Sequence, residues 1–234
     1  MTTPHRFAIY YVPHPATPLA RFACTWLGRD VEDGSAVPAL AVEGLEPARH
    51  AALTADPRLY GFHATLKPPF RLADDANEAA LLDAVAAYAA RTAPVRLPAL
   101  RLATLGHFMA LVPAAPAAAL DALAADCVRV FDSFRAPPEE AEVARRRMAR
   151  LSARQEALLA AWGYPYVMEE FRLHLTLTGR LTPDDQALLA PILARLTAPF
   201  CGTPFDIEAL AVCVQPAPGA PFVLQRRFIL AGTI

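Results

Sequence analysis

The sequence is short of lysine, of net charge and of long apolar runs. Only one of its 22 basic residues is a lysine, Lys67, and the formal net charge at pH 7 is −1. Without an excess of positive charge, the chain has no overall field to attract a polyanion, which favours a small phosphorylated substrate over a long nucleic acid. Although 55% of the residues are hydrophobic, no apolar stretch approaches the roughly 20 residues that span a bilayer.

Paired cysteines and a secretory signal are also missing. The four cysteines, at positions 24, 127, 201 and 213, include no C-x-x-C pair, which argues against a zinc ribbon and a dithiol redox centre. The first residues, MTTPHRFAIYYVP, contain one arginine and no small-residue cleavage site. We therefore expect a cytoplasmic protein with no metal, no cofactor, no membrane association and no obligate protein partner. The sequence leaves its oligomeric state open.

The chain alternates between strand and helix patterns. In each half, a strand with the pattern H-x-T precedes a helix and then two further strands. The predicted strands are 6–12, 60–67, 97–104, 108–112, 171–178, 205–214 and 222–230, and the predicted helices are 17–28, 77–91, 117–134, 139–162 and 183–196.

This order predicts a single bilobal α+β domain over residues 1–234. Two pseudo-symmetric lobes, each with an antiparallel sheet and helices, are expected to enclose a central cleft. The first lobe spans approximately 55–115 and the second approximately 166–234, with the N-terminal strand joining the sheets. The segment of approximately 116–163 between them is predicted to be a helical linker or lid.

Two predicted strands place a histidine and a threonine on one polar face. Side chains alternate between the faces of a strand, so His63 and Thr65 share a face with Lys67, and the residues between them are apolar. His174 and Thr176 share a face in the second strand in the same way. Residues i and i+2 of a strand lie about 6.5 to 7 Å apart, which suits two contacts to one phosphate.

These paired faces fit acid–base chemistry on a phosphodiester. Cleavage needs a base that removes a proton from the nucleophile and an acid that protonates the leaving oxygen. Imidazole titrates near neutral pH and can serve as either. We therefore predict His63 and His174 as the acid–base pair, in an order that the sequence leaves open, and Thr65 and Thr176 as donors to the phosphate oxygens. This mechanism requires no metal.

Further substrate contacts are predicted from position alone. Lys67 and Arg172 share the polar faces of the two motifs and are expected to add positive charge near the phosphate. Tyrosines near the motifs and on the first strand are expected to stack on the substrate or bond to it, with core packing as the alternative for each. They are Tyr11 or its neighbour Tyr10, Tyr60 and Tyr166.

The other histidines and an arginine-rich helix have less specific patterns. A single H-x-T is more often structural than catalytic, so the second copy is what favours catalysis. A surface or structural role is expected for His5, His14, His50 and His107. The arginines at 145, 146, 147 and 150 either grip a substrate phosphate from a lid or form a solvated helix face.

The segments HATL (63–66) and HLTL (174–177) resemble the duplicated H-x-T/S-x signature of the two-histidine (2H) phosphoesterases, the LigT-like superfamily. More narrowly, the segments 60–70, 162–167 and 171–181 resemble a branch of phosphonate-metabolism proteins encoded in carbon–phosphorus-lyase operons. The resemblance implies a bilobal fold with both motifs at a central cleft and metal-independent chemistry on cyclic phosphodiesters or 2′-5′ linkages. It also implies catalytic roles for His63 and His174, with Thr65 and Thr176 as phosphate ligands.

We therefore expect a phosphodiesterase that hydrolyses a small cyclic phosphate, such as a ribose cyclic phosphate of phosphonate catabolism. An RNA 2′,3′-cyclic phosphodiesterase or end-processing enzyme is the alternative activity, and it would need a basic groove that extends from the cleft. A nucleotide-binding module without catalysis is the alternative outside enzymes. The two intact histidine–threonine pairs argue against that module.

Overall fold

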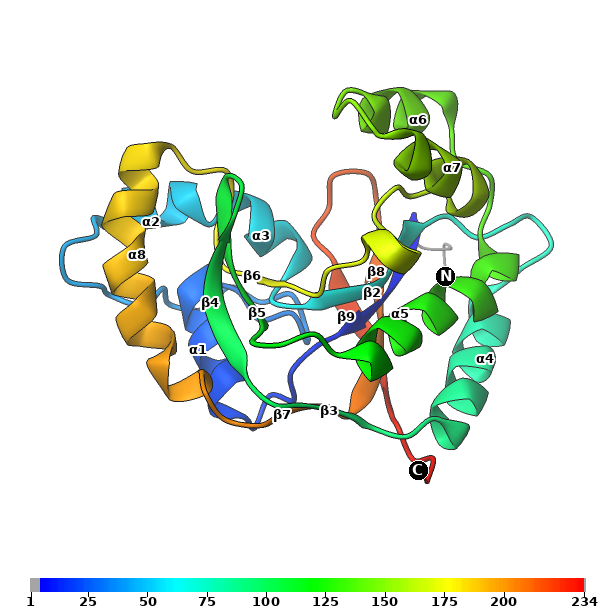
Figure 1. The fold of residues 1–234 in the computed structure, drawn as a ribbon, viewed down its shortest axis with the longest axis horizontal. Helices are drawn as coiled ribbons and strands as arrows, with labels where there is room; N and C mark the ends of the chain where they lie inside the picture. Colours follow the sequence, from blue (N-terminus) through cyan, green and yellow to red (C-terminus); the bar gives the residue numbers. More distant parts are fainter. Residues whose placement is uncertain (1–4, 234) are drawn as a thin grey trace.

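A four-stranded antiparallel sheet forms the centre of the computed structural model, which describes residues 5–233 (Figure 1). Its strand order is β2-β1-β8-β9. Strand β8 is buried along its whole length because it lies inside the sheet, between β1 and β9, and is covered on both faces. The strands are β1 (Arg6–Tyr11), β2 (Ala64–Phe70), β8 (Ala209–Gln215) and β9 (Val223–Ile229).

A second antiparallel sheet, of order β4-β5-β6, carries the other motif. Strands β4 (Leu100–Leu105) and β5 (Phe108–Pro113) form a hairpin, and β6 (Leu175–Thr176) pairs with β5. A short ladder of β3 (Val95–Leu97) and β7 (Phe205–Ile207) lies between the two sheets in Figure 1. These pairings put the two H-x-T segments in different sheets.

Helix ends follow the capping residues of the sequence. The Thr17 hydroxyl accepts a hydrogen bond from the Ala20 amide at the start of α1, and Gly28 ends that helix in the left-handed conformation. Within residues 5–233, no helix is long and apolar enough to cross a membrane. The helices are α1 (Pro18–Leu27), α2 (Pro47–Leu53), α3 (Ala55–Tyr60), α4 (Glu78–Arg91), α5 (Ala118–Val130), α6 (Glu140–Arg147), α7 (Ala153–Trp162) and α8 (Pro183–Thr197), with 3₁₀ turns at Asp132–Phe134, Met168–Glu170 and Ala198–Phe200.

The helices gather on both sides of the molecule. Helices α1 and α8 lie beside the second sheet, α4 and α5 beside the first, and α6 and α7 project away from both (Figure 1). Helix α5 is part of the core, since Leu120, Leu123 and Cys127 are almost completely buried. Of the predicted helical linker or lid, α5 therefore belongs to the core, and only the α6–α7 pair stands apart from the sheets.

Most predicted elements are confirmed within a few residues. The largest difference is the predicted strand 171–178, which pairs as a strand only at Leu175–Thr176. The alternation nevertheless holds over residues 171–177, because the odd-numbered residues are buried and the even-numbered ones are not. Between the predicted helix 17–28 and the predicted strand 60–67, the structure adds α2 and α3, and α3 includes Tyr60 at its end.

The α+β class with antiparallel sheets is confirmed, whereas the pseudo-symmetric lobes and their boundaries stay predictions. Each sheet combines strands from both halves of the sequence. Strand β2 of the first motif lies in the sheet of β8 and β9, and β6 of the second motif lies in the sheet of β4 and β5. The two halves are therefore interleaved rather than side by side.

The prediction that Lys67 contacts the substrate is wrong. The side chain is 2% exposed, and its ammonium donates to the Val128 carbonyl and to Asp132, both at 3.1 Å. A β-bulge turns Lys67 away from the face that carries His63. On β1, the adjacent residues Ile9 and Tyr10 pair with Lys67 and Thr65 of β2, so Leu66 is the extra residue of the bulge. Burial lowers the pKa of Lys67, and the charge of Asp132 opposes that shift.

We predict that Lys67→Ala lowers the free energy of unfolding by about 3 kcal/mol, because the change removes one partner of a buried ion pair. Urea denaturation of the purified variant measures this loss. Arg129→Ala, which removes an exposed pair with Asp126, is the control and should change the free energy by less than about 1 kcal/mol. Equal stability of the Lys67 variant and the wild type would contradict the structural role.

Candidate active site

The two motifs occupy equivalent places at the starts of their strands. His63 directly precedes β2, and Thr65 is the second residue of that strand. His174 directly precedes β6, and Thr176 is again the second residue. In both motifs, the apolar residue between histidine and threonine is completely buried, so the core holds the polar pair in its orientation.

The two imidazoles make the same hydrogen bond. Nδ1 of His63 lies 2.9 Å from the carbonyl oxygen of Gly61, and Nδ1 of His174 lies 2.8 Å from that of Arg172. A carbonyl can only accept, so Nδ1 carries the proton in both rings. In the neutral ring, Nε2 is therefore the basic atom. Nε2 of His63 lies 3.3 Å from the Thr65 hydroxyl.

Gly61 places the carbonyl that holds His63. Its φ of +73° lies in the left-handed region, which residues with a side chain rarely adopt. A Cβ atom at this position would lie 2.5 Å from Cγ2 of Val31. Both the conformation and the close approach therefore require glycine two residues before His63.

His63 is enclosed by aromatic rings. Tyr10 stacks on the imidazole with ring centroids 3.9 Å apart, and Tyr60 lies at 6.1 Å. Burial is the main cause that lowers the pKa of His63 to about 4, the bond to Gly61 opposes it, and the charge of His174 lowers it further. His63 is therefore neutral at pH 7, which makes it a base rather than an acid.

Two neighbouring cavities connect the motifs. The first, of about 470 Å³, is lined by His63 and Thr176, and the second, of about 300 Å³, is lined by Thr65 and His174. Leu105 and Phe108 line both. Each cavity thus combines the histidine of one motif with the threonine of the other, as a phosphate held between the motifs would require.

The other predicted contacts divide between the cavities and the core. Tyr60 lines the first cavity, and Tyr166 and Arg172 line the second. The guanidinium of Arg172 also donates to the carbonyls of Glu169 and Phe171. Tyr11 is 4% exposed and packs edge-on against Phe205, so its predicted contact with a substrate is wrong.

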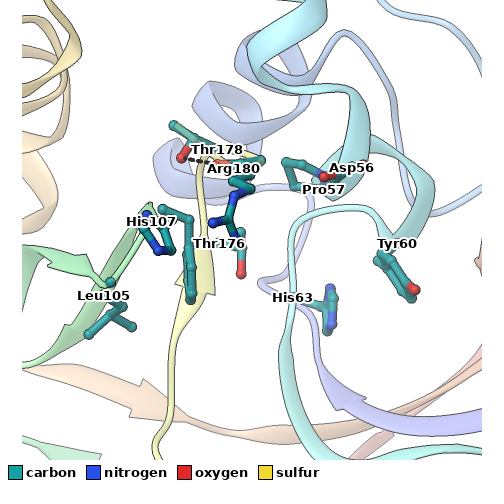
Figure 2. Close-up of a pocket in the computed structure, with 12 residues that line it drawn as sticks. Asp56, Pro57, Tyr60, His63, Leu105, His107, Thr176, Thr178 and Arg180 are labelled. Atoms are coloured by element: carbon teal, nitrogen blue, oxygen red, sulfur yellow. Dashed lines mark hydrogen bonds between the residues drawn. The ribbon is translucent and has the colours of Figure 1, made fainter. Parts of the chain in front are cut away.

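Four polar residues of the first cavity were not predicted as site residues, namely Asp56, His107, Thr178 and Arg180. Arg180 points into the cavity beside Thr176, with His107 and His63 on either side of it in Figure 2. Asp56 lines the same cavity. The alternation of His174 and Thr176 ends before Arg180, because the intervening Thr178 is buried. His107 lies exposed in the β4–β5 turn, as its expected surface role requires, and it also lines the first cavity.

Metal-binding groups do not accompany the histidines. Over residues 5–233, no three side chains of His, Cys, Asp or Glu come together in a way that could hold a metal ion. The two motifs instead offer two imidazoles and two hydroxyl groups, and the first cavity adds the Arg180 guanidinium. This set can exchange protons and balance negative charge.

Comparisons with known proteins identify relatives along most of the chain. Residues 65–223 match the family model described as "Protein of unknown function (DUF1045)". The chain is 39% identical over 231 residues to the protein named ribose 1,5-bisphosphate phosphokinase PhnN of Janthinobacterium sp. (strain Marseille), covering 97% of this chain and 51% of that protein. The protein of the same name from Laribacter hongkongensis (strain HLHK9) is 38% identical over 222 residues, covering 94% and 51%. The chain spans about half the length of both relatives.

We predict that His63 titrates near pH 4 in the folded protein, which two-dimensional NMR of the imidazole signals measures. Histidine in the unfolded chain titrates near 6.5, so between these pH values the unfolded state binds more protons and stability falls as the pH falls. Compared with His63→Gln, the wild type should lose an additional 2 kcal/mol or so between pH 6.5 and 4. A midpoint near 6.5 and parallel stability curves would contradict the assignment.

Proposed function

The chain belongs to the DUF1045 family, and we propose that it is a metal-independent phosphodiesterase that hydrolyses a small cyclic phosphate by two-histidine acid–base catalysis. The observation that carries the proposal is the repeated Nδ1 bond, which makes Nε2 the basic atom of both His63 and His174 and directs Nε2 of His63 toward Thr65. The crossed lining of the two cavities supports it, because each holds one histidine and the opposite threonine.

The different surroundings of the histidines assign their roles. His63 is neutral near pH 7 because of its enclosure, so its Nε2 takes a proton from the attacking water. As the new phosphorus–oxygen bond forms, the opposite phosphorus–oxygen bond breaks. The leaving oxygen takes its proton from Nε2 of His174 in the imidazolium form. The reaction leaves a phosphomonoester with one free hydroxyl group, a protonated His63 and a neutral His174. A proton transfer through solvent then restores the starting protonation states of the two histidines.

The increase of negative charge on the phosphate needs positive partners. Thr65 and Thr176 donate hydrogen bonds to the non-bridging oxygens, and Arg180 supplies the cation from the first cavity. Arg180 thus takes the role that the sequence suggested for Lys67, whose ammonium is held by Asp132.

The assignment of base and acid also determines how the substrate is oriented between the two cavities. The nucleophile and the leaving oxygen lie on opposite sides of phosphorus in an in-line displacement, so water enters beside His63 from the first cavity. The leaving oxygen faces His174, and the sugar that carries it occupies the second cavity. Tyr166 and Arg172 line that cavity, so they are the predicted contacts that face the sugar.

The name of the relatives describes a kinase, and this chain matches only about half of each. A phosphate-binding loop of a nucleotide kinase has the form G-x-x-x-x-G-K-[ST]. The only lysine of this chain, Lys67, follows Leu66 and precedes Pro68. We therefore propose that the kinase name refers to the other half of the relatives. Opening a ribose cyclic phosphate would then give a ribose phosphate of the kind the kinase name describes, consistent with a role in phosphonate catabolism.

Hydrolysis assays with and without a chelator test this function. The substrates are ribose 1,2-cyclic phosphate, nucleoside 2′,3′-cyclic phosphates and a bis-aryl phosphodiester. Fastest turnover of the ribose compound, unchanged by the chelator, is expected. Preference for the nucleotides would favour the RNA enzyme, and nucleotide binding without turnover would favour the binding module. Phosphate transfer from ATP to ribose 1,5-bisphosphate by this chain would contradict the division of roles.

We predict that His63→Ala and His174→Ala each lower kcat by about 10² to 10⁴, because each removes one proton transfer from the transition state. Steady-state kinetics on the best substrate measures the loss. His14→Ala, which changes an exposed histidine outside both cavities, is the matched control. Wild-type rates in either motif variant would refute the acid–base pair.

A further inference from the structure

Arg29 is a buried cation whose hydrogen-bond partners are main-chain carbonyls. It follows the glycine that ends α1, and it is 6% exposed. Nη1 donates to the Arg58 carbonyl at 3.2 Å, and Nη2 donates to the Phe222 carbonyl at 2.5 Å. Nε is buried and has no hydrogen-bond partner within residues 5–233. Arginine keeps its charge in proteins, and a charge taken out of water is costly, so an ion pair does not explain this burial.

The two carbonyls belong to segments that are far apart in the sequence. Arg58 lies in α3, and Phe222 directly precedes β9. The segments also meet without Arg29, because the Phe222 amide donates to the Leu59 carbonyl at 2.7 Å. Arg29 adds one bond to each segment from a third, the residues after α1. Its planar guanidinium, with two terminal nitrogens at fixed separation, is suited to hold two carbonyls at once.

These segments carry rings that surround the base of the proposed reaction. Tyr60, two residues after Arg58, stacks on Phe222 with centroids 5.4 Å apart. Phe222 also packs against Tyr10, at 6.0 Å, and Tyr10 is the ring that stacks on His63. Tyr60 and His63 line the first cavity together (Figure 2). The carbonyls that Arg29 binds therefore lie in the segments that position the enclosure of His63.

The same guanidinium lies beside Gly61. A Cβ atom at Gly61 would be 3.6 Å from Nη1 of Arg29, and the Gly61 carbonyl is the one that Nδ1 of His63 contacts. A shift of residues 58–61 would thus move this carbonyl and the Tyr60 ring together. The orientation of His63 and its enclosure both depend on the segment that Arg29 holds.

We infer that Arg29 is a positioning residue for His63, because it ties the end of α3 to the start of β9 and so holds the Gly61 carbonyl and the surrounding rings in place. Arg29 itself lies outside both cavities and acts through these segments. The inference rests on the proposed function only for its effect on catalysis, since the surroundings of His63 can be measured without turnover.

The titration of His63 in two Arg29 variants tests the inference by two-dimensional NMR. The wild type should have its midpoint near pH 4. Arg29→Met should raise the midpoint by about one pH unit or more, because a loosened enclosure lets water reach the imidazole. Arg29→Lys keeps the charge and most of the stem but has one nitrogen in place of two separate donors. It should shift the midpoint in the same direction, and it decides the test alone if Arg29→Met does not fold.

The groups that face His63 and titrate are Tyr10, Tyr60 and His174, and the variants change none of them. Lys67→Ala, which weakens the fold at the α5 contact, is the control and should keep the midpoint near pH 4. Wild-type midpoints in both Arg29 variants would overturn the inference. So would a shift in Arg29→Met alone, which would assign the effect to charge, or an equal shift in the control, which would assign it to general loosening.

Steady-state kinetics separates this inference from the proposed function. Arg29→Lys should lower kcat about 10-fold and leave KM within about twofold of the wild type, since the base is misplaced while the phosphate contacts remain. The acid limb of the pH–rate profile should move to higher pH with the NMR midpoint. A raised KM with unchanged kcat would contradict the positioning role. A raised NMR midpoint in a chain that hydrolyses no cyclic phosphate would support Arg29 as a positioning residue and refute the hydrolase proposal.

Discussion

The site depends on the bond from the Nδ1 proton of each motif histidine to the carbonyl two residues earlier. This bond fixes the tautomer and the direction of Nε2 in both rings, with nearly equal lengths of 2.9 and 2.8 Å. For His63, the position of this carbonyl depends on Gly61, which adopts a backbone conformation that residues with a side chain rarely adopt. The core then fixes the threonines by burying the apolar residue between each pair. Every later step of the proposed chemistry uses these two orientations.

Two nearly identical motifs acquire different properties from their surroundings. His63 lies under Tyr10 in the first sheet and loses most of its contact with water. Within residues 5–233, His174 has one aromatic neighbour, Phe108, with centroids 5.6 Å apart, so fewer rings enclose it than enclose His63. The interleaving of the sheets produces this asymmetry, because each motif strand packs on elements from the other half of the chain. The two histidines therefore have different environments although the H-x-T motif is repeated.

The sequence alone predicted the motif pairs and most elements, because alternation along a strand and the capping residues are local signals. Lys67 was misplaced because a bulge at Leu66 interrupts the alternation, and a bulge depends on the partner strand. Tyr11 was misplaced because its face is decided by packing against Phe205. The cavity position of His107 could not be predicted, since a turn between two strands comes to the cavity only through tertiary structure. Arg180 could not be predicted either, because the alternation ends at the buried Thr178 and only the tertiary structure brings Arg180 to the cavity.

The burial of Lys67 gives the folded chain an unusual chemical property. Apart from the α-amino group, it contains no other amine, and the one ε-amino group is 2% exposed between α5 and Asp132. Reagents that modify lysine therefore have no side-chain target on the native surface. Labelling at this position would report only molecules in which the β2–α5 contact has opened, so the lone lysine serves as an intrinsic probe of that opening.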